Sequence, residues 1–171
     1  VYNRSLISSM INEYGFENAK EVVSGWVSNL ATEVFSNDTN ALKAVSSGQC
    51  GVTIVNTYYF ARLLGDPKYD NLSIFWANQD DRGVHVNISG AGILKTSKNK
   101  ANAKKLLEYF ASEDAQYFYA SANKEYPVID DVLIDKSIKS WGKFKEDTVN
   151  VSMLGSLQKQ AVYLAQEVGY K

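Results

Sequence analysis

Two adjacent tyrosines, Tyr58 and Tyr59, are the residues of this sequence whose type and spacing could do chemistry. A phenolate is a hard, charged oxygen donor that suits a hard trivalent cation such as Fe³⁺. Free tyrosine has a pKa of about 10, so phenolate is scarce at neutral pH, but a bound cation favours the charged form. Tyr2 precedes a helix-like pattern in the same way, and three phenolates would balance the charge of Fe³⁺. Judged by spacing alone, a Tyr-Tyr pair is more often packing than chemistry, because tyrosine buries much apolar area.

The tyrosine pair lies where an expected strand meets an expected helix. Residues 52–55 form a short apolar run that predicts a buried strand, and residues 61–64 predict the apolar face of a short helix that Gly65 ends. Ligands of open α/β sheets bind at such a turn, where both hydroxyls could converge on one point. Asn56 is a candidate helix cap. Arg62, one turn further on, either holds a positive charge behind a phenolate or is a plain surface residue.

The bulk composition limits the classes of protein and of site. The chain has 171 residues, of which 45% are hydrophobic and 22% charged, as expected of one globular domain. A net charge of −1 provides no basic field for nucleic acid. The single cysteine, Cys50, excludes a thiolate cluster and the single histidine, His85, excludes a histidine cluster, so oxygen ligands must dominate any metal site. The sequence starts at Val1 without a signal peptide, and we expect a fragment of a longer chain or a processed one.

The apolar pattern predicts helices that alternate with short strands, which is typical of an α/β fold. The expected helical stretches cover residues 6–14, 18–30, 41–45, 61–64, 103–110, 115–119 and 153–167. The expected strands cover residues 52–55, 72–76 and 84–88. Polar residues that could cap the helices are Asn3, Ser5, Asn37, Asn99 and Ser112.

Other motifs leave three alternatives to iron open. The first is a binding protein for an anion or a small organic ligand, held at helix N-termini near Tyr2 and Asn56. The second is an enzyme that uses Asp80, Asp81 and His85, although such an aspartate pair in a loop more often serves capping and ion pairing. His85 itself lies in a strand pattern and fits a core or hinge histidine better than a general base. The third is an interaction module without a small ligand.

The sequence Asn-Thr-Tyr-Tyr at residues 56–59 resembles the iron motif of bacterial ferric-ion-binding proteins. These are periplasmic substrate-binding subunits of iron-importing ABC transporters, and the resemblance, which covers the whole chain, is to their cyanobacterial branch. It implies an α/β, periplasmic-binding-protein-like (class II) fold of two lobes, with Fe³⁺ in the cleft between them. It also implies a membrane permease as partner, a periplasmic location and no catalysed reaction. The further ordered matches are residues 2–6, 78–83, 85–92 and 140–145.

The resemblance also assigns roles to single residues. Tyr58 and Tyr59 match the adjacent tyrosine ligands of the family, and Tyr2 matches the tyrosine ligand that precedes them. Arg62 and Asn56 match positions beside the ligands.

The resemblance divides the chain into three segments. Residues 1–84 correspond to the C-terminal lobe, residues 85–130 to a crossing strand and a segment that completes the N-terminal lobe, and residues 131–171 to the return to the C-terminal lobe. Most of the N-terminal lobe, with any ligand that it carries, is absent from this sequence. We therefore expect that lobe as a partner, in the same chain or as a separate fragment.

Overall fold

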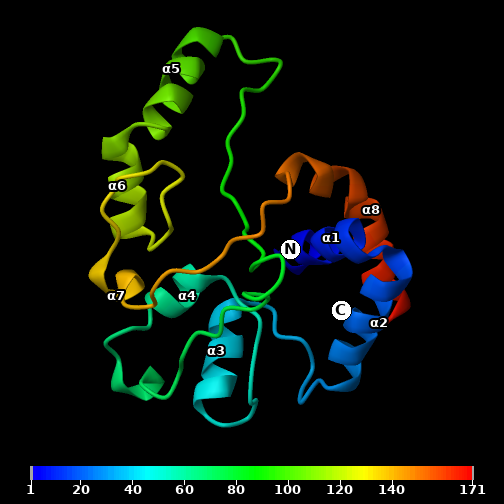
Figure 1. The fold of residues 1–171 in the computed structure, drawn as a ribbon. Coiled ribbons are helices and arrows are strands. Elements are labelled where there is room, and N and C mark those ends of the chain that lie inside the picture. The colour runs from blue at the N-terminus through cyan, green and yellow to red at the C-terminus, as the bar shows by residue number, and fades with distance from the viewer. Residues whose placement is uncertain (1, 171) are drawn as a thin grey trace. The chain divides into compact units, whose positions relative to one another are not determined.

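The computed structural model of the chain describes residues 2–170 and divides into two compact units (Figure 1). Within the described residues, unit 1 contains residues 2–56, 71–87 and 144–170, and unit 2 contains residues 57–70 and 88–143. The chain therefore passes between the units four times. The three lobe segments expected from the resemblance stay a prediction.

Unit 1 is built on three long helices, α1 (Tyr2–Tyr14), α2 (Phe16–Ser28) and α8 (Val151–Glu167), which lie side by side in Figure 1. Each helix turns one apolar stripe inward, so the helical stretches expected around residues 6–14, 18–30 and 153–167 are confirmed. Gly15, with φ 80°, occupies the sharp turn between α1 and α2. The shared core consists of Ile7, Met10, Ile11, Ala19, Val23, Ala161 and Leu164.

Some of the predicted helix caps are confirmed, whereas in others the side chain bonds to a distant residue instead of to the helix. Asn37 caps α3 (Asp38–Ser46), because its side chain accepts a hydrogen bond of 2.9 Å from the backbone N–H of Asn40. The predicted caps at Asn3 and Ser5 are wrong, because α1 already begins at Tyr2. Tertiary partners occupy both side chains instead: Asn3 donates to the hydroxyl of Tyr170 at 2.6 Å, and Ser5 bonds to His85.

Unit 2 contains α4 (Thr57–Ala61), η1 (Pro67–Tyr69), α5 (Lys100–Phe110), α6 (Glu113–Ala122) and α7 (Lys136–Lys139). Ser112 caps α6 as expected, by accepting from the backbone N–H of Ala115. The sequence pattern missed η1 and α7, because elements of three or four residues show no periodicity. Their aspartate caps, Asp66 and Asp135, were the available signal. No helix within residues 2–170 is long and apolar enough to cross a membrane.

The three predicted strands are not regular strands. Within residues 2–170, β-type pairing is limited to an isolated parallel bridge between Val84 and Glu146. Val52, expected in a buried strand, is 80% exposed, and Phe75, expected in a strand, is 88% exposed. An alternating apolar pattern reports which side chains favour burial, but a strand also needs a partner backbone, and no ladder forms here among the described residues.

Candidate metal centre

The tyrosine pair lies on α4 in unit 2, and the two rings contact each other. Their centroids are 4.4 Å apart, with an angle of 35° between the ring planes. Adjacent residues of a regular helix point about 100° apart, so ring contact between them is not the usual arrangement. Both Tyr58 and Tyr59 are half-buried. The structure therefore brings two phenols into one small region at the start of unit 2.

The opposite side of α4 anchors this short helix. Phe60 and Ala61 are buried, and the ring of Phe60 stacks on Trp141 with centroids 5.5 Å apart and an angle of 6°. Because the buried side chains occupy one side of α4, the phenols are left on the other. Trp141 was not expected to take part, since it lies 81 residues further along the chain.

Arg62 places a positive charge over both phenol rings. Its guanidinium carbon is 5.1 Å from the ring centroid of Tyr58 and 5.7 Å from that of Tyr59, which is within cation–π distance. A cation at this distance stabilises negative charge on a phenolate. Arg62 thus lies beside both phenols while its side chain is exposed, and its role beside a bound metal stays a prediction.

The other two predicted site residues belong to unit 1. Tyr2 is the first residue of α1 and is 41% exposed. Asn56 is the last residue before the chain enters unit 2, and its backbone N–H donates to Asp38 Oδ2 at 2.8 Å. The structure thus brings together Tyr58, Tyr59 and Arg62, whereas a set of three tyrosine ligands stays a prediction.

Nitrogen, sulfur and carboxylate donors do not form a metal site in the part of the chain that the structure describes. No three His, Cys, Asp or Glu side chains among residues 2–170 are grouped so that they could hold a metal ion. Phenol oxygens are outside that set of donors.

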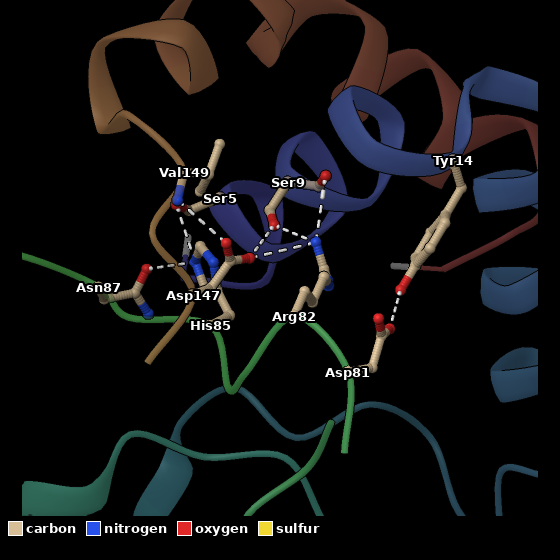
Figure 2. Close-up of polar contacts among 9 residues, drawn as sticks. All are labelled: Ser5, Ser9, Tyr14, Asp81, Arg82, His85, Asn87, Asp147 and Val149. Carbon is tan, nitrogen blue, oxygen red and sulfur yellow. Dashed lines mark hydrogen bonds and ion pairs between the residues drawn. The ribbon is translucent and has the colours of Figure 1, made fainter. Parts of the chain in front are cut away.

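Two residues of the alternative catalytic set, Asp81 and His85, have separate partners in unit 1 (Figure 2). The Nε2 atom of His85 lies 3.1 Å from Ser5 Oγ and 3.2 Å from Asn87 Oδ1. The carboxylate of Asp81 accepts from the hydroxyl of Tyr14 at 3.5 Å. Asp81 and His85 are thus engaged with different neighbours, and the structure does not support a catalytic set made of the two.

Burial lowers the pKa of His85, while the hydrogen bond to Asn87 opposes this shift. The Nδ1 atom is buried without a hydrogen-bond partner among the described residues, so protonation would bury an unpaired N–H. The unfolded chain, with a histidine pKa of about 6.5, binds this proton more tightly than the folded chain. We expect neutral His85 to make its full contribution to the free energy of unfolding above about pH 6.5. This contribution should be lost as the pH falls from about 6.5 towards the lower pKa of His85 in the folded chain.

Urea unfolding at about pH 7.5 and about pH 5 measures this effect, because the two values lie on either side of the unfolded histidine pKa. Carboxylates also begin to titrate at the lower pH, so the same pair of measurements on His85→Gln is the control. The difference between the two unfolding free energies should be smaller in His85→Gln. An equal difference in both proteins would contradict the prediction.

A pocket of about 340 Å³ lies elsewhere in unit 1. It carries charges of both signs, so it offers no net field for an anion, and neither Tyr2 nor Asn56 lines it. Its lining residues are Asn12, Glu13, Arg82, Lys145, Asp147, Thr148 and Val149.

Comparison with known proteins places this chain in a family. Residues 30–117 match the model of the family described as bacterial extracellular solute-binding protein. The chain is 43% identical over 176 residues to iron uptake protein A1 of Synechocystis, a match that covers 99% of this chain and 49% of that protein. The chain therefore spans about half the length of the curated relatives it matches.

Solved structures give the same result. A Trichodesmium protein in complex with iron and citrate matches with a TM-score of 0.93 and 41% identity, over 99% of this chain and 56% of that chain. The ferric binding protein from Campylobacter jejuni matches with a TM-score of 0.93 and 35% identity, over 98% of this chain and 55% of that chain. These matches confirm the expected class, a periplasmic-binding-protein-like α/β fold of which this chain forms a part. The chain belongs to the family of bacterial extracellular solute-binding proteins, and its similarity is to iron-uptake and ferric-iron-binding members.

Proposed function

We propose that this chain binds ferric iron through tyrosine phenolates, with Tyr58 and Tyr59 as adjacent ligands and Tyr2 as the third. The observation that carries the proposal is the contact between the rings of Tyr58 and Tyr59, with the guanidinium of Arg62 over both. The relatives support the choice of metal, since one is named an iron uptake protein and another was solved with iron and citrate.

The chemistry of the donors fits ferric iron as cargo. Phenolate oxygen is a hard, anionic donor, and three such donors neutralise a trivalent cation. The positive charge of Arg62, which lies over both rings, offsets part of the negative charge that two adjacent phenolates would carry. Asn56, the other residue proposed beside the ligands, donates its backbone N–H to Asp38 within unit 1.

The role of the bound iron follows from the family. A solute-binding protein delivers its ligand to a membrane permease, so we infer that this chain is part of a periplasmic protein that hands Fe³⁺ to an ABC importer. The remaining half of such a protein supplies the second lobe, and closure of two lobes around the metal would exclude water. No reaction is catalysed. Release is favoured by acid, because protons compete with the metal for phenolate oxygen.

A visible absorption titration with ferric nitrilotriacetate tests the proposal on the unchanged chain. We expect a broad phenolate-to-iron charge-transfer band that saturates at one iron per chain, because ferric phenolates absorb visible light. Gallium, a colourless trivalent ion, should displace the iron and remove the band. The same titration on a chain extended to the length of its relatives reports the contribution of the second lobe.

Two results would contradict ferric binding by phenolates. The first is the absence of a band in both the unchanged and the extended chain. The second is tight binding of an anion or a small organic ligand with no colour change and no dependence on iron. That second result would favour the ligand class expected at helix N-termini.

A further inference from the structure

Asparagine occupies the unit 1 side of three of the four crossings between the units. Asn56 and Asn87 are the last residues before the chain enters unit 2, and Asn71 is the first residue after it returns. Asparagine is common in loops because its side chain bonds to nearby backbone. Each of these three side chains also bonds to a part of unit 1 at least 18 residues away in sequence.

Two of these asparagines are held by the two ends of α3. At its start, Asp38 Oδ2 accepts from the backbone N–H of Asn56 at 2.8 Å and from its Nδ2 at 3.2 Å. At its end, the backbone carbonyl of Ser46 accepts from Asn71 Nδ2 at 2.9 Å, and Ser46 Oγ donates to Asn71 Oδ1 at 3.3 Å. One rigid helix therefore sets the distance between the places where the chain leaves unit 1 at Asn56 and re-enters it at Asn71.

The third asparagine, Asn87, forms a hydrogen bond to Asn56, so the two places where the chain leaves unit 1 are directly linked. Asn87 Nδ2 donates to Asn56 Oδ1 at 2.8 Å, and Asn87 Oδ1 is 3.2 Å from His85 Nε2. The same nitrogen of His85 reaches Ser5 Oγ on α1, as Figure 2 shows for Asn87, His85 and Ser5. A continuous series of hydrogen bonds thus runs from the first turn of α1 through both exit points to α3.

We propose that Asn56, Asn71 and Asn87 are positioning residues for the iron ligands. They hold the crossings at fixed places on unit 1. Asn56 is two residues before Tyr58, so its bonds to Asp38 and Asn87 hold the unit 1 end of the segment that leads to the tyrosine pair. Ser5 is one turn after Tyr2 on α1, so the same series of bonds reaches the helix that carries the third tyrosine. This inference rests on the proposed function, because it concerns the arrangement of those ligands.

Asn87→Ala tests the proposal, with Asn18→Ala as the matched control. Asn18 also lies in unit 1 and also donates one side-chain hydrogen bond, of 2.9 Å, but to the carbonyl of Tyr14 on a neighbouring turn. Amide hydrogen exchange of residues 56–60 in the iron-free chain reports the crossing directly. Competition with nitrilotriacetate reports the affinity for iron, and urea unfolding reports overall stability.

We expect Asn87→Ala to speed exchange at residues 56–60 and to weaken iron binding, each by about fivefold, the size of the one net hydrogen bond that links Asn87 to Asn56 at the crossing. The charge-transfer band and the urea midpoint should match those of Asn18→Ala, which a merely structural role would not predict. Unchanged exchange, or faster exchange with unchanged iron affinity, would overturn the positioning role while leaving iron binding intact. Absence of the band in the unchanged and extended chains would overturn the proposed function, and the positioning role with it.

Discussion

Replacing both Tyr58 and Tyr59 with phenylalanine is expected to abolish the ferric charge-transfer band of the chain. The affinity for ferric iron should fall by more than about 100-fold, because loss of a group that only orients a ligand already costs 10- to 100-fold. Phenylalanine keeps the ring contact and the cation–π contact with Arg62 but has no oxygen to coordinate the metal. Visible absorption and competition with nitrilotriacetate measure the two effects.

The matched control for the tyrosine pair is Tyr69→Phe. Tyr69 is a half-buried tyrosine of η1 in the same unit, and it is outside the predicted ligand set. Its replacement should leave both the band and the affinity unchanged. A band that persists in the double variant Tyr58→Phe/Tyr59→Phe would show that other residues bind the iron, and the ligand assignment would then be wrong.

Changing Asp147 to asparagine is expected to destabilise the chain by about 3–5 kcal/mol, because it leaves the buried charge of Arg82 without its partner. The Nη1 atom of Arg82 is 3.2 Å from Asp147 Oδ2, and the two side chains are only 9% and 8% exposed. The hydroxyl of Ser9 on α1 donates to the same carboxylate oxygen at 3.1 Å and accepts from Arg82 Nη1 at 2.8 Å. Urea unfolding of the iron-free chain measures the loss.

The ion pair lies at the centre of the polar network in Figure 2 and joins distant segments of unit 1. The backbone N–H of Val149 donates to Asp147 Oδ1 at 3.0 Å, and the guanidinium of Arg82 covers the ring of Tyr14 at 5.1 Å. The carboxylate thus accepts from three groups, and an asparagine amide cannot replace its charge.

Two further variants distinguish destabilisation by an unpaired buried charge from destabilisation by loss of any ion pair. Lys104→Ala removes an exposed i,i+4 ion pair with Glu108 and should cost less than about 0.5 kcal/mol. Arg82→Met/Asp147→Leu removes both buried charges and should be less destabilised than Asp147→Asn alone, because no unpaired charge remains. A double variant that is destabilised as much as Asp147→Asn, or more, would contradict the assignment of the loss to an unpaired buried charge.

The sequence by itself determined the features that depend on neighbouring residues. The apolar stripes of α1, α2 and α8 repeat at helical spacing, so their helices and their core faces could be predicted. Asn37 and Ser112 were recognisable as caps, because the hydrogen bond of a cap spans only three residues. The adjacent phenols of Tyr58 and Tyr59 were visible as candidate metal ligands from their type alone.

Only the tertiary structure decided which distant groups meet. Arg82 pairs with Asp147, which is 65 residues away, rather than with the aspartates next to it, because only Asp147 is buried beside it with Ser9. His85 meets Ser5 across 80 residues of sequence. The expected strands failed for the same reason: alternation describes one segment, whereas a strand needs the backbone of another. The pattern of residue types shows which side chains of a segment favour burial or hydrogen bonding. Which distant residue becomes the partner depends on how the whole chain packs.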